Sequence, residues 1–349
     1  MMSIRLVLAI VTALFILPEV VLADGELRYA DLGECPLESG QTIRDCRLGY
    51  RTFGVLNAEK SNAVLFATWL SGTAEDLAAL GYIGPGKMAD SSKYFIVAVD
   101  AFGNGVSSSP SNSKGQPGAT FPRFTIRDLT TAQSRLVTRH LGLPRLQGIM
   151  GISMGAINAL QWSVSHPGSV DWVVAIAGTP RQTAYDLLLW QGQLDIIRST
   201  RGIEGGGLKA MKTITAVHNL NAWTPANLNT RIRPEDMPRF LAESETIITK
   251  YDAENWASQV EAIMSQDLYR GFGNSPEETA RTVKARNLIV WSREDRMVQP
   301  GPARDWARLV GAETLELTGD CGHFAFLCEK DAIQAAVAAF LAAGQDVMK

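Results

Sequence analysis

A serine stands between two glycines in Gly151-Ile152-Ser153-Met154-Gly155, where a stretch typical of a strand gives way to one typical of a helix. In this G-x-S-x-G pattern the flanking glycines permit a sharp turn, which lifts the serine clear of the sheet. The serine then lies at the helix N-terminus, where the helix dipole favours developing negative charge. We therefore expect Ser153 to be a nucleophile.

A serine hydroxyl is a weak nucleophile and needs a base within hydrogen-bond reach. The chain has only four histidines. His140 and His166 each end an expected helix, and His218 lies in a helical stretch where packing is the simpler role, although substrate contact stays open. His323 occupies a Gly-His turn after the last expected strand. Because the base comes last in the chain order that accompanies this serine pattern, we expect His323 to be the base.

The base in turn needs a carboxylate that fixes its tautomer. Glu294 and Asp295 both follow the penultimate expected strand, and either could serve. Charge developing on the substrate's carbonyl oxygen needs backbone N–H donors, which form an oxyanion hole. We expect these donors to be Met154, directly after the nucleophile, and Leu70, in the loop after the strand that ends near Trp69.

Strands and helices alternate along most of the chain. This alternation predicts an α/β fold with a mostly parallel central sheet and helices on both faces. Residues 181–285 contain helical patterns but no convincing buried strand, and we expect them to form a helical cap over the strand ends. The core would then comprise residues 24–180 and 286–349. The expected strands are 46–53, 63–69, 94–99, 146–151, 172–177, 287–291 and 314–317; the expected helices are 125–140, 154–165 and 332–343.

The composition is that of a folded globular chain. Of 349 residues, 46% are hydrophobic, and 33 Lys and Arg against 36 Asp and Glu give a net charge of −3. This balance offers no electrostatic footprint for nucleic acid. It suits an uncharged small-molecule ester as substrate, and the chemistry described requires no cofactor. A homo-oligomer stays open.

The N-terminus has the pattern of a secretory signal peptide. Arg5 precedes an unbroken apolar run from Leu6 to Leu17, and small or modest residues follow up to Ala23. The run is shorter than the roughly 20 residues needed to span a bilayer. We expect cleavage after Ala23, so that residues 1–23 are a signal peptide, with an uncleaved anchor as the alternative. The mature chain would be periplasmic or secreted, without a stable membrane anchor.

If the chain is exported, its four cysteines are expected to form disulfides, because an even number of cysteines in an oxidising compartment is usually paired. Cys35 and Cys46 bracket an expected hairpin, and Cys321 and Cys328 bracket His323. We expect one bridge within each pair. A zinc site made from Cys321, His323 and Cys328 is the competing reading, but it lacks a fourth ligand at a usual spacing, so no metal is expected.

Several stretches along the chain combine into one family pattern. They are Ile83-Gly84-Pro85-Gly86-Lys87, the segment 121–128, the extended serine motif up to Trp162, Asp295 with Pro300, and the segment 322–327. In these stretches the chain resembles the homoserine O-acetyltransferase family within the α/β-hydrolases. The resemblance implies acyl transfer through an acyl-serine, favours Asp295 over Glu294, and supports Leu70 as an oxyanion donor.

Two departures from the family pattern bear on the substrate. Phe324 stands where the family typically has an aspartate facing the amino group of homoserine, and Lys212 is the nearest candidate for the cap arginine that would bind the carboxylate. An apolar ring there would leave an amine unpaired, which strongly disfavours an amino-acid acceptor. We therefore expect an exported serine hydrolase that cleaves carboxylic esters. The aromatic residues considered as pocket walls are Trp69, Trp162, Trp190 and Phe324.

Two other functions stay open. One is transfer of an acyl group to an alcohol or an amino-acid hydroxyl, as the family resemblance suggests. The other is a non-catalytic binding protein on a hydrolase scaffold, against which the complete set of Ser153, Asp295 and His323 argues.

Overall fold

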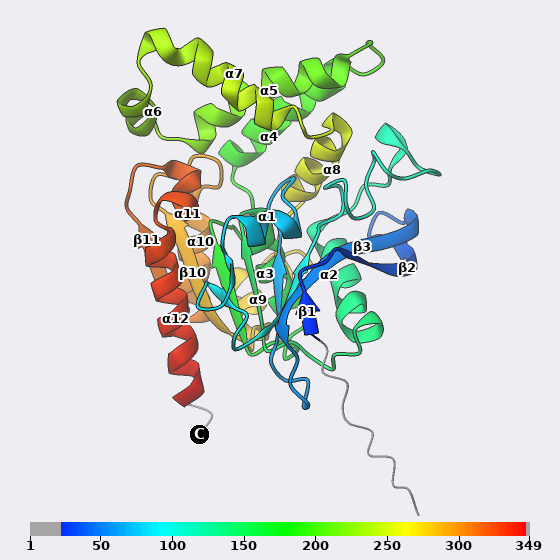
Figure 1. Ribbon diagram of the computed structural model, residues 1–349, viewed down its shortest axis with the longest axis vertical. Helices are drawn as coiled ribbons and strands as arrows, with labels where there is room; N and C mark the ends of the chain where they lie inside the picture. The colour runs from blue at the N-terminus through cyan, green and yellow to red at the C-terminus, as the bar shows by residue number, and fades with distance from the viewer. Residues whose placement is uncertain (1–21, 347–349) are drawn as a thin grey trace, which may run out of the picture.

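The computed structural model describes residues 22–346, and its centre is a nine-stranded sheet. The strands run in the order β1-β3-β7-β4-β8-β9-β10-β11, and β2 also pairs with β3. The six strands from β7 to β11 in this order are parallel, while β1, β2 and β7 pair antiparallel with β3. The strand bounds are β1 Leu22–Asp24, β2 Arg28–Pro36, β3 Thr42–Val55, β4 Ala63–Ala67, β7 Phe95–Val99, β8 Gly148–Ile152, β9 Trp172–Ile176, β10 Arg286–Ser292 and β11 Glu313–Leu317. The expected α/β class with a mostly parallel sheet is confirmed (Figure 1).

Helices cover both faces of this sheet. Every residue of β4, β7, β8 and β9 is buried, which explains why these strands are continuous apolar runs rather than alternating patterns. On one face pack α2 (Ile126–Arg135), α3 (Met154–Ser165) and α10 (Pro300–Val310). On the other pack α1 (Ala74–Ala79) and α12 (Lys330–Asp346).

The segment between β9 and β10 contains the cap. Its helices are α4 (Ala184–Ser199), α5 (Gly206–Ala222), α6 (Pro225–Arg231), α7 (Met237–Ile248) and α8 (Ala253–Met264). Figure 1 shows these helices at one end of the sheet, with α8 nearer the core than α5 and α7. The expected cap of residues 181–285 is too long at its C-terminal side, because Leu268 and Tyr269 pack against Trp306 of α10, and α9 (Pro276–Thr282) follows on the core.

The N-terminal ribbon lies at the edge of the sheet. Cys35 of β2 and Cys46 of β3 form a disulfide across the hairpin, with an S–S distance of 2.01 Å. The first 21 residues of the expected signal peptide lie outside the described residues; Leu22 and Ala23, its last two, belong to β1 and pair with Val55 and Gly54 of β3.

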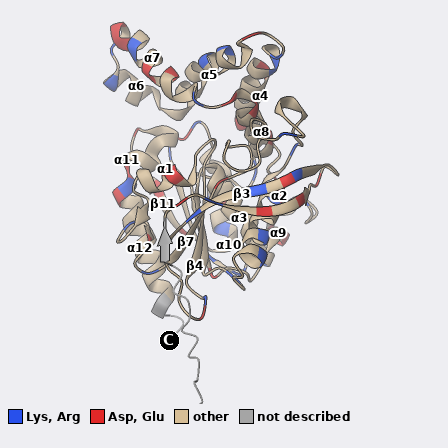
Figure 2. Cartoon of the chain, turned by 45° about the vertical axis from the view of Figure 1, so that its right-hand side comes forward, with Lys and Arg blue, Asp and Glu red and all other residues tan. Residues whose placement is uncertain are grey.

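Charged residues of both signs are interspersed over the core and the cap (Figure 2). From residue 22 to residue 346, none of the helices combines the length and the apolar character needed to cross a membrane.

Candidate active site

Ser153 occupies a strained turn between β8 and α3. Its backbone has φ 55° and ψ −119°, an arrangement that residues with a side chain rarely adopt. The two flanking glycines are needed because the chain is tightly packed here. A Cβ on Gly151 would lie 2.1 Å from the carbonyl of Gly155, and a Cβ on Gly155 would lie 2.2 Å from the Ala67 oxygen. The strain is therefore held by close backbone packing, and it fixes the direction of the serine side chain.

Three side chains far apart in sequence meet at this turn. His323 Nε2 lies 2.9 Å from Ser153 Oγ, and His323 Nδ1 lies 2.7 Å from Asp295 Oδ2. All three residues are buried, with at most 9% of their surface exposed. In the tautomer protonated at Nδ1, the imidazole donates to Asp295 and accepts from the Ser153 hydroxyl. This is the geometry in which a base can withdraw the serine proton.

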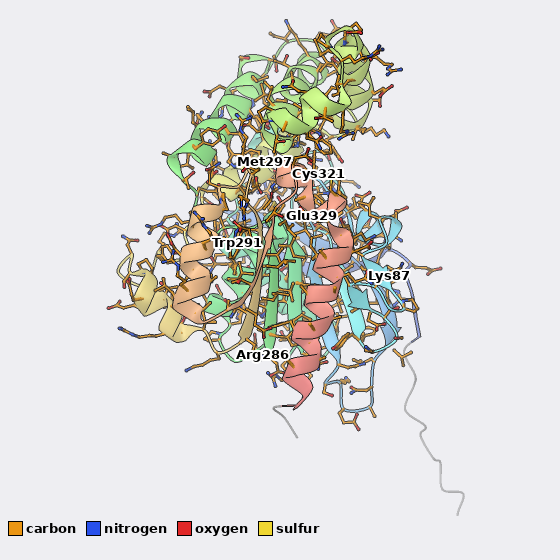
Figure 3. The ribbon with its side chains drawn as sticks, turned by 90° about the vertical axis from the view of Figure 1, so that its left-hand side faces the viewer. Lys87, Arg286, Trp291, Met297, Cys321 and Glu329 are labelled. Atoms are coloured by element: carbon orange, nitrogen blue, oxygen red, sulfur yellow. A yellow bond between two sulfur atoms is a disulfide. The ribbon has the colours of Figure 1, made fainter. Side chains whose placement is uncertain are left out.

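Asp295 is held in place by the backbone. Its Oδ1 accepts hydrogen bonds from the amides of Met297 and Val298, each at 2.9 Å, which leaves Oδ2 for the imidazole. The neighbouring Glu294 is exposed, so the carboxylate that meets His323 is Asp295. Figure 3 shows Met297 at the end of the core that faces the cap, whereas Arg286 lies at the opposite end.

His140 and His166 lie outside this site. His140 Nε2 is 3.2 Å from the Tyr50 hydroxyl, and His166 packs on Trp162. Burial lowers the pKa of His166.

The expected oxyanion donors, Leu70 and Met154, both line the cavity that contains Ser153. In the described part of the chain, neither of their amides has a protein acceptor. The loop that carries Leu70 is held from the cap: Gln259 Oε1 of α8 accepts from the Ser71 amide at 2.6 Å, and its Nε2 donates to the Phe102 carbonyl at 2.8 Å. Two free amides beside Ser153 are what a developing oxyanion requires.

His323 lies in a turn that is fixed at both sides. Cys321 and Cys328 form a disulfide around it, with an S–S distance of 2.02 Å, so their thiols are not available to a metal. The preceding residue, Asp320, is bonded to the cap, because the Thr224 hydroxyl donates to its carbonyl and Asn227 Nδ2 donates to its carboxylate. The position of the imidazole therefore depends on a crosslink and on the cap.

A cavity of about 610 Å³ lies between the core and the cap, above Ser153 and His323. Phe324 is on its wall, with its ring centroid 4.8 Å from that of Trp223 and 5.9 Å from that of Phe326. The cavity is mainly aromatic and aliphatic. Its aromatic wall residues are Trp69, Trp190, Trp223, Phe240, Tyr251, Trp256, Phe324 and Phe326.

Two of the residues considered for the pocket are elsewhere. Lys212 is on the outer side of α5, with 54% of its side chain exposed, and its nearest carboxylate is Glu245 at 3.9 Å. The expectation that it lines the substrate pocket is wrong, because it is not among the residues that line the cavity. Trp162 is packed in the core, where its Nε1 donates to Ser169 at 2.9 Å.

Besides Ser153 and His323, the cavity wall carries six polar residues, of which only His218 was left open from the sequence as a substrate contact. These residues are Asp76, His218, Asn219, Arg231, Glu243 and Ser244. Burial, with a smaller contribution from the nearby His323, lowers the pKa of His218 to about 3. A sequence signal existed for His218, because it continues the buried stripe of Met211, Ile214 and Thr215 along α5.

Comparison with known proteins places this site in a family. Residues 83–329 match the model of the alpha/beta hydrolase fold. The chain belongs to this family. An ethyl acetate hydrolase of Pseudomonas veronii is 35% identical over 279 residues, covering 76% of this chain and 80% of that protein. The chain is thus an enzyme of the class that acts on ester bonds.

Two further relatives of this α/β-hydrolase have different named activities, one a transferase and one an esterase. A homoserine O-acetyltransferase of Methanococcoides burtonii is 28% identical, covering 88% of this chain and 72% of that protein. The crystal structure of the acetyl esterase MekB superposes with a TM-score of 0.84 at 27% identity, covering 90% of this chain and 97% of that one. Esterases and O-acetyltransferases are therefore both among its relatives, and the resemblance to the homoserine O-acetyltransferases is confirmed.

Proposed function

We propose that this α/β-hydrolase is an exported serine esterase, which cleaves uncharged carboxylic esters through an acyl-serine with water as the acyl acceptor. The observation that carries the proposal is the hydrogen-bonded series of Ser153, His323 and Asp295 beneath an aromatic cavity. The similarity to an ethyl acetate hydrolase and an acetyl esterase supports acetyl as the acyl group.

The arrangement supports a two-stage reaction. His323 takes the Ser153 proton as the oxygen attacks the ester carbonyl, and the amides of Leu70 and Met154 stabilise the oxyanion. His323 then protonates the alcohol oxygen as the C–O bond breaks, which leaves the acyl-serine. The same imidazole then takes a proton from water as the water oxygen attacks the acyl carbon. His323 returns this proton to Ser153 Oγ as the acyl C–O bond breaks, which releases the acid and regenerates Ser153.

Phe324 favours water over an amino acid as the acceptor. Its ring is in contact with other aromatic rings, and the charge of an ammonium group would have no carboxylate partner at this position. Transfer to an alcohol or amino-acid hydroxyl is the second candidate, favoured by the homoserine O-acetyltransferase relatives and by Arg231 and Glu243 on the cavity wall.

The test offers purified protein an aryl acetate, and separately acetyl-CoA with homoserine or serine. We expect release of acetate and the phenol, abolished in Ser153→Ala. Acetylated amino acid forming faster than free acetate would establish the transferase instead. No turnover, together with no labelling of Ser153 by a fluorophosphonate, would indicate a non-catalytic binding protein.

Export rests on the N-terminal sequence, and the two disulfides support it. We expect the protein produced with its full N-terminus to be recovered outside the cytoplasm, in the periplasm or the medium, beginning at Asp24. Recovery in the cytoplasm with Met1 retained would contradict this.

A further inference from the structure

The cavity is larger than a two-carbon acyl group requires. Pockets of roughly 300–1,000 Å³ enclose drug-sized ligands, and this one measures about 610 Å³. If the acyl group is acetyl, as the proposed function holds, it occupies only the space beside Ser153 and the oxyanion amides. The remaining volume, which the cap helices wall with aromatic rings, must hold the alcohol.

Two of the three charged residues on the wall, Asp76 and Arg231, are engaged with protein partners. Asp76 accepts from the amide and hydroxyl of Thr73, both at 2.8 Å. Arg231 lies 4.5 Å above the Trp223 ring and donates to Asn227. The third, Glu243, has 72% of its side chain exposed, so that solvent reaches its charge. The rest of the wall is mainly aromatic and aliphatic, which fits an alcohol that carries no charge.

His218 is a polar wall residue whose two ring nitrogens have no hydrogen-bond partner among the described residues. Its ring packs edge-on against Trp256 at 5.2 Å and lies 6.4 Å from Phe324. Its Nδ1 is enclosed by protein without a hydrogen-bond partner, whereas its Nε2 is not enclosed and the residue borders the cavity. Among the described residues, then, His218 has an unused polar atom available to a bound molecule.

The tautomer follows from these surroundings. Because His218 stays neutral well below pH 7, only one of its nitrogens carries a proton. An enclosed N–H without an acceptor is rarer in proteins than an enclosed acceptor without a donor. The proton is therefore better placed on Nε2, where a ligand can accept it.

We propose that the cavity binds the bulky, uncharged alcohol of an acetate ester, and that the Nε2–H of His218 donates a hydrogen bond to an oxygen carried by that alcohol. This inference rests on the proposed function, because it assigns the acyl group to the space beside Ser153. It makes His218 a specificity-determining residue with no part in the proton transfers.

The experiment compares matched pairs of esters. Cyclohexylmethyl acetate is measured against tetrahydropyranylmethyl acetates with the ring oxygen at each position, so that each pair differs by one oxygen for one methylene. We expect the best oxygenated ester to have a higher kcat/KM than its carbon analogue. In His218→Phe, which keeps a ring against Trp256, that preference should fall about 5- to 10-fold, as expected for one lost hydrogen bond.

Two further variants separate this effect from a change of shape. Phe240→Leu alters the wall without touching a hydrogen-bonding group, so both esters should change by the same factor. His218→Gln restores a donor and should recover part of the preference. An unchanged preference in His218→Phe would overturn the inference, and so would a higher kcat/KM for ethyl acetate than for every bulky ester. In both cases ester cleavage by the wild-type protein would still support the proposed esterase function. No cleavage of any ester and no acylation of Ser153 would instead reject the proposed function itself.

Discussion

Gln259 of the cap helix α8 accepts a hydrogen bond from the backbone amide of Ser71, at 2.6 Å, although the two residues are 188 positions apart. Gln259 is fully buried, and Ser71 has a φ of 58°, so a strained residue next to Leu70 is held by a side chain from the cap. The oxyanion loop thus depends on a contact outside the core.

We expect Gln259→Leu to reduce kcat about 10- to 100-fold with little change in KM. Displacement of the Leu70 amide weakens a bond made to the transition state rather than to the substrate. Steady-state kinetics on an aryl acetate measure this. Asn255→Leu is the matched control on α8, because it removes comparable bonds to Ser111, away from the site. Equal losses of kcat in both variants would show a general effect of the cap.

Asp295→Asn should lower kcat by about 10⁴. The amide oxygen can keep the bonds to Met297 and Val298, which directs the NH₂ group at His323 and favours the wrong tautomer of the imidazole. Rates on an aryl acetate, with circular dichroism to verify folding, measure this. Glu294→Gln should leave the rate unchanged, because that side chain is exposed; a comparable loss there would contradict the assignment of the acid.

The two disulfides provide a comparison of their own. They close loops of similar length, so the serine pairs Cys35→Ser/Cys46→Ser and Cys321→Ser/Cys328→Ser should each cost about 2–3 kcal/mol in the free energy of unfolding. Only the second pair surrounds His323, and only it should lower kcat at temperatures where both variants are folded. Denaturant titration and kinetics test the two expectations separately. Four free thiols in denatured, unreduced wild-type protein would mean that neither bridge forms.

Asp100 should give stability a pH dependence. It is buried at the end of β7, where it accepts from the Ala74 amide and Asn104, and burial raises its pKa to about 6. Between the ordinary value of 3.8 and about 6 the folded state binds more protons than the unfolded state. The contribution of Asp100 to the unfolding free energy therefore falls as pH rises through this window, by at most about 1.4 kcal/mol per unit.

Denaturant titrations of wild type and Asp100→Asn from pH 4 to pH 7 isolate this contribution, since other groups titrate in both proteins. We expect the stability of the variant relative to wild type to increase with pH across the window. A constant difference would show that Asp100 titrates normally.

Phe324→Asp tests the account of the acceptor. A carboxylate placed against Trp223 and Phe326 should reduce kcat/KM for a neutral ester about tenfold or more, because the charge must be desolvated. It should also improve use of homoserine as acyl acceptor, measured as O-acetylhomoserine formed from an aryl acetate. Unchanged affinity for homoserine would show that Phe324 does not set this preference.

The parts of the fold and site set by local pattern could be predicted from the sequence. The tight turn at Ser153 needs glycine on both sides, and β8 and β9 are apolar runs because both their faces are covered. Lys212 and His218 are on the same cap helix, but only His218 continues its buried stripe, whereas Lys212 is exposed. The family resemblance alone did not distinguish these two sides of the helix. The hydrogen bond between Gln259 and the Ser71 amide could not be predicted, because the sequence around a glutamine does not indicate which distant backbone group its side chain contacts.

The cap contacts two of the three parts that the proposed chemistry requires. Gln259 holds the loop of Leu70, and Thr224 and Asn227 hold the turn of His323, while Ser153 belongs to the core. Displacing the cap would therefore disturb the Leu70 donor and the base together, while the Met154 donor stays with the nucleophile in the core. A substitution at these cap contacts can therefore change the rate of the reaction without altering a residue that touches the ester.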